Sequence, residues 1–268
     1  MNYEYKNLIK IVMYYMLFGI FWIFYSAKFL HLMTRDLSTY IVLEHYKSYL
    51  YIFLTTALLF KMIRSGYLKM EKSNRKFQQG IVQSFIAALE FHDEYTKGHS
   101  EAVASYSLEI GKALGLKGSD LDDLYWAATM HDIGKIIVPI EILNKSEKLT
   151  DKEYEIIKEH SKTGYEIVSK NESLKKVSKY ILYHHERWDG IGYPEGLKGE
   201  EIPLLSQIIS VADSWHAMTS KRSYKDQLTC QEAIEELVKN KGTQFAPQIV
   251  TTFIKVYNLR KDLFLFEK

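Results

Sequence analysis

The sequence has one cysteine and four prolines in 268 residues. Because Cys230 is alone, an intramolecular disulfide framework and any zinc site built on paired cysteines are excluded. The first proline is Pro139, so no proline breaks a helix in the first half of the chain. With 47% hydrophobic and 25% charged residues, the chain can bury a sizeable core. These features favour an all-α protein with one full-sized domain and an appendage.

The chain also has little net charge, +2 overall, but this average hides two different parts. Residues 1–80 hold 11 Lys and Arg against 4 Asp and Glu, and residues 81–268 hold 24 against 29. The acidic C-terminal part would repel a phosphate backbone, and it has no basic face interleaved with aromatic residues. We therefore predict that the partners include no polynucleotide.

Two uncharged apolar runs mark the first part. Residues 11–27 carry no charge and the run continues past Lys28, whereas residues 49–60 form a shorter and weaker run. About 20 apolar residues cross a bilayer, so we predict a membrane anchor at residues 1–63, with transmembrane helices at about 11–31 and 48–63. A cleaved signal peptide is an alternative, although no A-x-A cleavage pattern follows. Buried core helices are another, which the Tyr and Trp residues flanking the runs disfavour.

Basic residues lie beside both runs. Lys6 and Lys10 precede the first run, and six Lys and Arg residues follow the second within about 20 residues, where positive charge marks the cytoplasmic side. We predict that both ends of the anchor face the cytoplasm. Residues 64–80 are expected to form a polar helical linker to the rest of the chain, with interruptions at Gly66 and Gly80.

Hydrophobic spacings of three and four residues predict a string of helices in residues 81–268. Helix starts are predicted at Ser119 and at two capping boxes, Thr150-x-x-Glu153 and Thr229-x-x-Glu232. Helix ends are predicted at or near Gly115, Gly134 and Gly164. Residues 186–203 are rich in glycine and proline, and an irregular stretch of that length is usually functional or disordered.

Two adjacent pairs, His131-Asp132 and His184-His185, are predicted to lie at helix ends. Successive side chains on a helix point about 100° apart, so neither pair can chelate one ion from ideal helix geometry. Such a pair suits two neighbouring metals, one residue to each, or a bridging carboxylate beside a terminal imidazole. Asp213 lies in an apolar helix, where a carboxylate is costly unless it pairs, hydrogen-bonds or binds metal. Singly, each of these residues also fits an ordinary core or surface position, and their joint occurrence points to a metal site.

Five motifs occur together in residues 77–256. They are YTKGHS from Tyr95, HDIGKI from His131, ILNK from Ile142, HHERWDGIGYP from His184 and LKGEEIP from Leu197. With them, this region resembles the bacterial HD-GYP domains, a branch of the HD metal-dependent phosphohydrolases that degrade the second messenger cyclic di-GMP. The resemblance implies an all-α, HD-type phosphohydrolase domain at residues 81–268. With the predicted helical hairpin, it implies a multi-pass protein of the bacterial cytoplasmic membrane whose catalytic domain is cytoplasmic.

The resemblance also implies a binuclear metal site. Five imidazoles and two carboxylates without thiolate suit divalent transition metals, iron or manganese ahead of zinc, and exclude an all-oxygen calcium cage. Asp132 would bridge the two ions. The implied ligands are His99, His131, Asp132, His160, His184, His185 and Asp213.

Further residues are assigned to catalysis and substrate binding by the same resemblance. Lys135 would add a cationic contact to the transition state, its alternative being an ordinary solvated lysine. Tyr193 would contact the substrate, or else anchor its loop by packing, and Gly192 would permit a close backbone approach. Arg222 and Lys225 match positions of basic phosphate contacts, although Lys225 also fits a solvated charge.

Two departures from the family's pattern concern the metal site, besides Lys221-Arg222-Ser223 where the family commonly has Asp-Arg-Pro. The family often carries Asp where this chain has His216, one helical turn after Asp213, and the change could alter the charge around the metals. Alternatively, His216 faces outward and has no influence on them. Some members hold a third metal with a Glu four residues before the first ligand histidine, where this chain has Tyr95, so we expect two metals.

Taken together, these patterns predict a membrane-anchored phosphodiesterase that hydrolyses a cyclic dinucleotide, cyclic di-GMP ahead of others, to pGpG, with a further step to GMP left open. Its predicted partners are this substrate and a lipid bilayer, with a homodimer left open. One alternative is a catalytically weak receptor for the dinucleotide or a partner protein. The other is a broader HD nucleotide phosphohydrolase, which would lack the Gly-Tyr-Pro loop.

Overall fold

A computed structural model describes residues 3–90, 98–145, 147–220 and 227–264. The predicted all-α class is confirmed, because these residues form helices without any β-strand and with a single isolated bridge, between Lys241 and Phe245. The chain divides into two compact units, Met1–Ile81 and Val82–Lys268.

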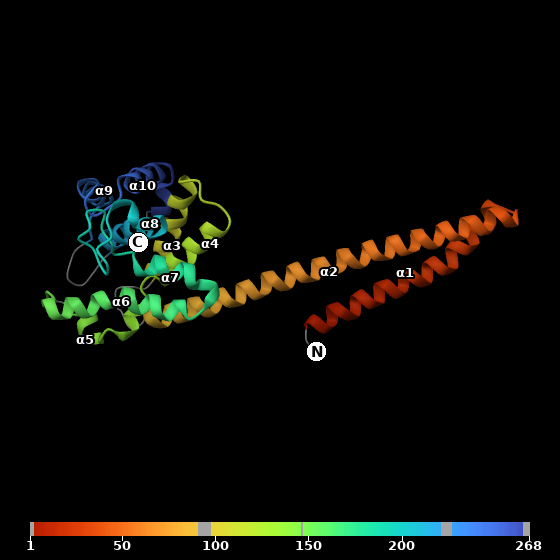
Figure 1. Ribbon diagram of the computed structural model, residues 1–268, viewed down its shortest axis with the longest axis horizontal. Helices are drawn as coiled ribbons and strands as arrows, with labels where there is room; N and C mark the ends of the chain where they lie inside the picture. Colours follow the sequence, from red (N-terminus) through yellow and green to blue (C-terminus); the bar gives the residue numbers. More distant parts are fainter. Residues whose placement is uncertain (1–2, 91–97, 146, 221–226, 265–268) are drawn as a thin grey trace. The chain divides into compact units, whose positions relative to one another are not determined.

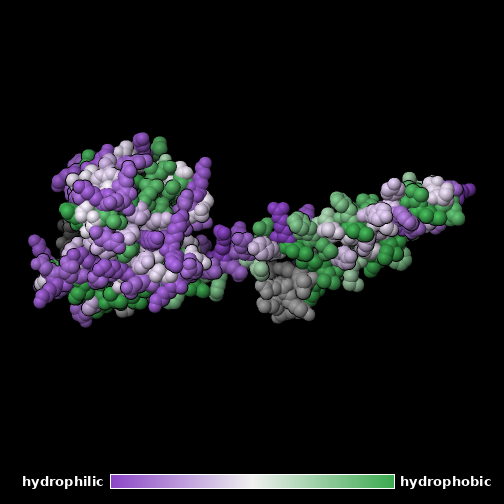
Figure 2. Space-filling model, viewed as in Figure 1, coloured by the Kyte–Doolittle hydropathy of each residue, from purple (hydrophilic) through white to green (hydrophobic). Residues whose placement is uncertain are grey.

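The first unit contains α1 (Tyr3–Met33) and most of α2 (Leu37–Glu90), which run beside each other in Figure 1. The Asp36 carboxylate accepts a hydrogen bond from the Thr39 backbone N–H at 2.9 Å, which caps the start of α2. Between the helices, the Tyr51 ring lies 5.8 Å from Trp22 and 6.3 Å from Phe18, measured between centroids. Most large apolar side chains of both helices are nevertheless exposed, as the green surface in Figure 2 shows.

One stretch of the described residues, Ile9–Met33, is long and apolar enough to cross a membrane. Its 25 residues, at 1.5 Å per residue, reach about 38 Å, against about 30 Å of hydrocarbon. The second apolar run lies inside the much longer α2.

The expected interruptions at Gly66 and Gly80 are wrong, because α2 continues through both positions. An isolated glycine costs a helix only about 1 kcal/mol relative to alanine, and the neighbouring Lys, Arg, Met and Gln residues favour helix.

The second unit is a helical domain, labelled α3 to α11 in chain order (Figure 1). Its longer helices are α3 (His99–Ala113), α4 (Ser119–Met130), α6 (Asp151–Ser169), α7 (Lys175–Leu182), α8 (Leu204–Thr219), α9 (Cys230–Lys239) and α10 (Pro247–Leu259). Shorter turns are η1 (Ile133–Ile137), α5 (Ile140–Leu143), η2 (Glu172–Leu174), η3 (Gly199–Glu201) and α11 (Lys261–Phe264).

The predicted helix starts are confirmed. α4 begins at Ser119, and both capping boxes form, with Thr150 and Thr229 each accepting from the N–H of the glutamate three residues on. Gly115 follows the end of α3 at φ 87°, a left-handed conformation that glycine adopts without strain.

The predicted helix end at Gly164 is wrong, since this residue lies inside α6. A Cβ atom there would be 2.9 Å from Ile181 Cγ2. A Cβ atom on Gly134, within η1, would be 1.9 Å from the His160 carbonyl oxygen. These two glycines therefore allow η1, α6 and α7 to pack closely, which brings the residues after α4 against α6.

The core of the domain lies between α3, α8 and α10. Trp215 of α8 is fully buried, with its ring centroid 4.9 Å from that of Phe253 in α10. Ile110 of α3 and Ile208 of α8 are also fully buried. This packing fixes α8, which carries Asp213, relative to α3, which begins at His99.

Candidate metal centre

All seven residues predicted as metal ligands meet in the helical domain. Different elements supply them, mostly at or beyond helix ends. His99 begins α3, His131 and Asp132 follow α4, His160 lies in α6, His184 and His185 follow α7, and Asp213 lies in α8.

Three of these residues, His99, His131 and Asp213, form what we call the His99 cluster. The Nε2 atoms of His99 and His131 are 3.2 Å apart, and Asp213 Oδ1 lies 3.4 Å from His99 Nε2. Each residue thus offers one ligand atom to a common point, with all such atoms within 4.8 Å of one another.

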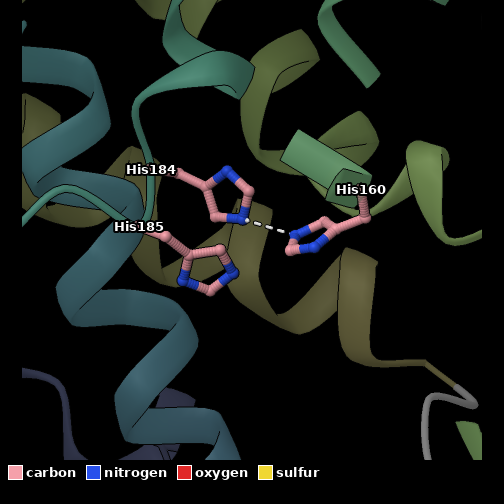
Figure 3. A group of neighbouring side chains, drawn as sticks. All are labelled: His160, His184 and His185. Carbon is pink, nitrogen blue, oxygen red and sulfur yellow. Dashed lines mark hydrogen bonds between the residues drawn. The ribbon is translucent and has the colours of Figure 1, made fainter. Parts of the chain in front are cut away.

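The His160 cluster contains His160, His184 and His185 (Figure 3). His160 Nε2 lies 3.4 Å from His184 Nε2, and the imidazoles of His184 and His185 both face His160 from the opposite side. His184 and His185 therefore both belong to this cluster. They do so because they follow the end of α7, where the 100° rotation between successive helical residues no longer applies.

Asp132 connects the two clusters. Its Oδ2 atom lies 3.4 Å from His131 Nε2 and 3.6 Å from His99 Nε2, whereas its Oδ1 atom lies 3.6 Å from His160 Nε2. A third group of converging ligand atoms joins His131, Asp132 and His184. The two carboxylate oxygens thus face different clusters, which is the arrangement that a bridging ligand needs.

The imidazoles are held by hydrogen bonds from their other ring nitrogen. The Nδ1 atoms of His131, His160 and His184 lie 2.6 to 2.7 Å from the backbone carbonyl oxygens three residues earlier, those of Ala128, Ile157 and Ile181. A carbonyl oxygen only accepts, so each Nδ1 carries a proton, and in the neutral ring Nε2 then has a free lone pair. This tautomer presents Nε2 as a metal ligand.

The electrostatics of the site favour ionised carboxylates and three neutral imidazoles, those of His160, His184 and His185, whereas His131 differs. Burial lowers the pKa of His184 to about 3 and also lowers the pKa of His160 and His185. Burial would raise the pKa of Asp132, but Lys135 and His131 outweigh it and hold that pKa well below its usual value. For His131, the carboxylates of Asp132 and Asp213 outweigh burial and raise the pKa to about 9.

These donors fit divalent transition metals. Five imidazoles and two carboxylates, with no thiolate, suit iron, manganese or zinc. Two features of this chain agree with that donor set. Ring nitrogens of the histidines converge in the clusters, and the two oxygens of Asp132 face different clusters.

A cleft of about 390 Å³ opens onto the clusters. Asp132, His185 and Asp213 reach it, together with Lys135 and Tyr193. Lys135 Nζ lies 2.7 Å from Asp132 Oδ2, and its side chain is 20% exposed. Lys135 is therefore an ion-paired residue of the cleft, and the alternative of an ordinary solvated lysine is wrong.

The glycine-rich loop packs against the histidines. The Tyr193 ring centroid is 4.9 Å from that of His185, and burial raises the pKa of Tyr193. A Cβ atom on Gly192 would lie 2.4 Å from the Arg187 backbone nitrogen, so the close approach at Gly192 is to the chain's own backbone. Arg222 and Lys225 lie outside the described residues.

Sequence reasoning missed Glu186, which stood in the quoted motif without a role. Its side chain is 3% exposed, and its Oε1 atom accepts hydrogen bonds from the backbone N–H groups of Glu195 and Gly196 at 2.8 and 3.0 Å. Glu186 thereby ties the middle of the loop to its start, directly after His185. The sequence signal that could have identified Glu186 is a carboxylate directly after the two adjacent histidines.

Comparisons with known proteins agree with this geometry. A model of the HD domain family matches residues 83–249. The chain belongs to the HD domain family. A cyclic di-GMP phosphodiesterase of Thermotoga maritima is 36% identical over 226 residues, which are 78% of this chain and 61% of the relative. A 3'3'-cGAMP-specific phosphodiesterase of Vibrio cholerae is 36% identical over 183 residues, 68% of this chain and 35% of the relative.

A solved structure shares the fold. The crystal structure of a cyclic GMP-AMP-specific phosphodiesterase of V. cholerae matches with a TM-score of 0.52 at 21% identity, over 68% of this chain and 49% of that chain. This HD protein therefore spans about 61% or less of the length of the curated relatives named here.

Proposed function

We propose that this protein is a metal-dependent phosphodiesterase that hydrolyses a cyclic dinucleotide. The observation that carries the proposal is the convergence of seven ligand residues in two clusters, with the oxygens of Asp132 facing both. The curated relatives, named as cyclic di-GMP and 3'3'-cGAMP phosphodiesterases, support the substrate class.

The proposed centre holds two divalent ions, iron or manganese ahead of zinc, because its donors are imidazoles and carboxylates. His99, His131 and Asp213 would hold one ion, His160, His184 and His185 the other, and Asp132 both. When bound, such ions activate water and neutralise charge on phosphoryl oxygens.

The chain's own residues orient and stabilise the substrate. Lys135 lies at the same carboxylate oxygen that faces the His99 cluster, so its ammonium is placed to stabilise negative charge that develops on a phosphodiester in the cleft. Tyr193 and Gly192 line the cleft beside His185, where the Tyr193 ring would pack against a base or ribose. Arg222 and Lys225 are proposed as phosphate contacts by their sequence positions alone.

The experiment is a hydrolysis assay on the purified full-length chain loaded with Mn²⁺ or Fe²⁺. Cyclic di-GMP, 3'3'-cGAMP and a nucleoside triphosphate are incubated separately, and the products are resolved by chromatography. We expect cyclic di-GMP to give pGpG and then GMP. Binding of cyclic di-GMP without turnover would instead support a receptor, and hydrolysis of the triphosphate alone would support a broader nucleotide phosphohydrolase.

The first unit is proposed as a multi-pass anchor in a bacterial cytoplasmic membrane, with spans at 11–31 and 48–63 and the HD domain in the cytoplasm. The exposed apolar surface of α1 and of the first part of α2 supports this proposal (Figure 2). The basic residues that follow residue 60 support the cytoplasmic placement of residues 64–80.

We also propose a homodimer, formed by α2 beyond the second apolar run. Uncharged residues recur there at alternating spacings of four and three residues, the repeat that packs two parallel helices as a coiled coil. These positions, all exposed, are Ile63, Tyr67, Met70, Asn74, Phe77 and Ile81, and we call them the α2 seam.

Two features of the α2 seam favour a second copy of the same chain in parallel orientation. Asn74 occupies a core position of the repeat, where it would pair with its own counterpart and fix the register. The seven charged residues between 61 and 76 all lie off the seam, and the seam is flanked on one side by Gly66, Ser73 and Gly80. Like charges would therefore not oppose each other across a parallel pair.

A further inference from the structure

His99 differs from three of the other four clustered histidines in how its ring is held. For His131, His160 and His184, the Nδ1 proton is donated to a backbone carbonyl three residues earlier. Each of those residues follows at least one turn of helix, which supplies that carbonyl. His99 is the first residue of α3, after Gly98 at φ 75°, and Thr96, three residues earlier, lies outside the described residues.

His216 lies beside His99 Nδ1, where those three imidazoles have a backbone carbonyl. Its Nδ1 atom is 2.8 Å from His99 Nδ1, and the two ring centroids are 4.8 Å apart. His216 lies in α8 one turn after Asp213, and its side chain is 7% exposed. The expectation that His216 could face outward is therefore wrong.

The contacts of the two rings determine where their protons lie. His99 Nε2 faces Asp213 and His131 as a ligand atom, so it must keep a free lone pair, and the His99 proton is on Nδ1. His216 Nδ1 must then accept this proton's hydrogen bond. The His216 proton is then on Nε2, and the Ser220 hydroxyl oxygen lies 3.1 Å from this atom and 3.3 Å from Nδ1. The contacts thus form a chain from His99 through His216 to Ser220.

We propose that His216 is a positioning residue of the metal centre, which holds the His99 imidazole in the tautomer and orientation that present Nε2 to the His99 cluster. It performs for His99 the task that backbone carbonyls perform for the other three histidines. The inference rests on the proposed metal site but does not depend on which dinucleotide is hydrolysed.

A purely structural role for His216 predicts something different. The Tyr106 ring lies 6.5 Å from that of His216, centroid to centroid, in the buried region between α3 and α8. If His216 only fills this space, an aromatic ring of similar size should replace it without effect on metal binding. If His216 accepts a hydrogen bond from His99 Nδ1, a smaller side chain that can also accept this hydrogen bond should preserve metal binding. A ring without an acceptor atom should preserve it less well.

The test is titration calorimetry with Mn²⁺ on the metal-stripped full-length chain. His216→Phe keeps a ring and removes the acceptor, whereas His216→Asn keeps an acceptor. Ser206→Ala is the matched control, because Ser206 is a buried residue of α8 whose hydroxyl donates to the Tyr180 carbonyl oxygen, away from the clusters. Thermal unfolding of each metal-free form reports whether it is folded. If the Phe variant does not fold, His216→Ala takes its place under the same criterion.

We expect the Phe variant to bind Mn²⁺ at one site about 10- to 100-fold more weakly, as is typical when a partner of a metal-bound histidine is removed. The Asn variant should recover most of this loss, and Ser206→Ala should bind like the wild type. Wild-type affinity in the Phe variant, or equal losses in the Phe and Asn variants, would overturn the inference. A wild type that binds no Mn²⁺ would overturn the metal site together with the inference. Normal Mn²⁺ binding without dinucleotide hydrolysis would contradict the proposed function alone.

Discussion

Lys135 and Asp132 form a close ion pair, with Nζ and Oδ2 2.7 Å apart at the rim of the cleft. The same Oδ2 atom faces His99 and His131, so the lysine charge lies where it can act on the substrate rather than replace a ligand. The ammonium group of Lys135 has no lone pair, so it cannot bind a metal ion. Its removal should therefore separate metal binding from catalysis.

Lys135→Met keeps the length of the side chain and removes its charge. We expect the variant to hold as much metal as the wild type and to lose about 10²- to 10³-fold in kcat, the usual effect of removing one group that stabilises transition-state charge. The measurement is steady-state hydrolysis beside metal analysis of the same sample. The control is Lys112→Met, which removes an ion pair with Glu109 on the surface. An unchanged kcat in Lys135→Met would contradict the role given to Lys135.

Gly134 matters because it has no side chain, which allows η1 to pack closely against α6. A Cβ atom there would lie 1.9 Å from the His160 carbonyl oxygen, and backbone cannot move aside as a flexible side chain can. We expect Gly134→Ala to destabilise the HD domain by about 3 kcal/mol or more, at the upper end of overpacking costs, and to lower Tm by roughly 6–12 °C. Thermal unfolding followed by circular dichroism measures this. The control Gly80→Ala, in open space on α2, should leave Tm of the domain unchanged, and equal Tm values for both variants would refute the packing role.

Individual helices were predictable from local chemistry to different degrees. The capping boxes at Thr150 and Thr229 predicted two helix starts because their hydrogen bonds are made within four residues. Gly164 was misread because a glycine that ends a helix and one that admits a neighbouring helix look the same in sequence. The contact of His99 with His216 spans 117 residues and depends on how α3 packs on α8. The motifs predicted which residues meet in the two clusters, but how these residues divide between the clusters required the fold.

The α2 seam makes a prediction about assembly. Phe77→Glu places a charge at a seam position whose side chain is 69% exposed, so two glutamates would face each other in a parallel pair. We expect the full-length chain to be a dimer and this variant to be a monomer in analytical ultracentrifugation in detergent. Leu68→Glu puts the same charge on an exposed position off the seam and should remain dimeric. A monomeric wild type, or a dimeric Phe77→Glu variant, would contradict the coiled coil.

The two units of the chain have opposite surface character and opposite charge. The first exposes apolar side chains and carries net positive charge, and the second has a mixed surface (Figure 2) and carries net negative charge. An acidic domain at an anionic membrane surface benefits from a basic segment between them, since each Lys or Arg near such a surface contributes about 1 kcal/mol.

The proposed helical hairpin makes a prediction about membrane topology. A reporter fused at Ser38, between the two proposed spans, should be located outside the cytoplasm, and one fused at Lys76 should be located inside. Reporter pairs that are active on opposite sides of the membrane measure this. A cytoplasmic signal from the Ser38 fusion would contradict the helical hairpin.

The central claim is that Asp132 joins two metal ions in a hydrolytic centre. The most direct measurement is metal content per chain, determined on the purified wild type and on Asp132→Ala, together with hydrolysis of cyclic di-GMP by both. We expect two transition-metal ions and turnover in the wild type. In Asp132→Ala we expect fewer bound ions and no turnover, because loss of a bridge removes a ligand from both ions. Full activity with unchanged metal content in Asp132→Ala would contradict the bridging role of Asp132.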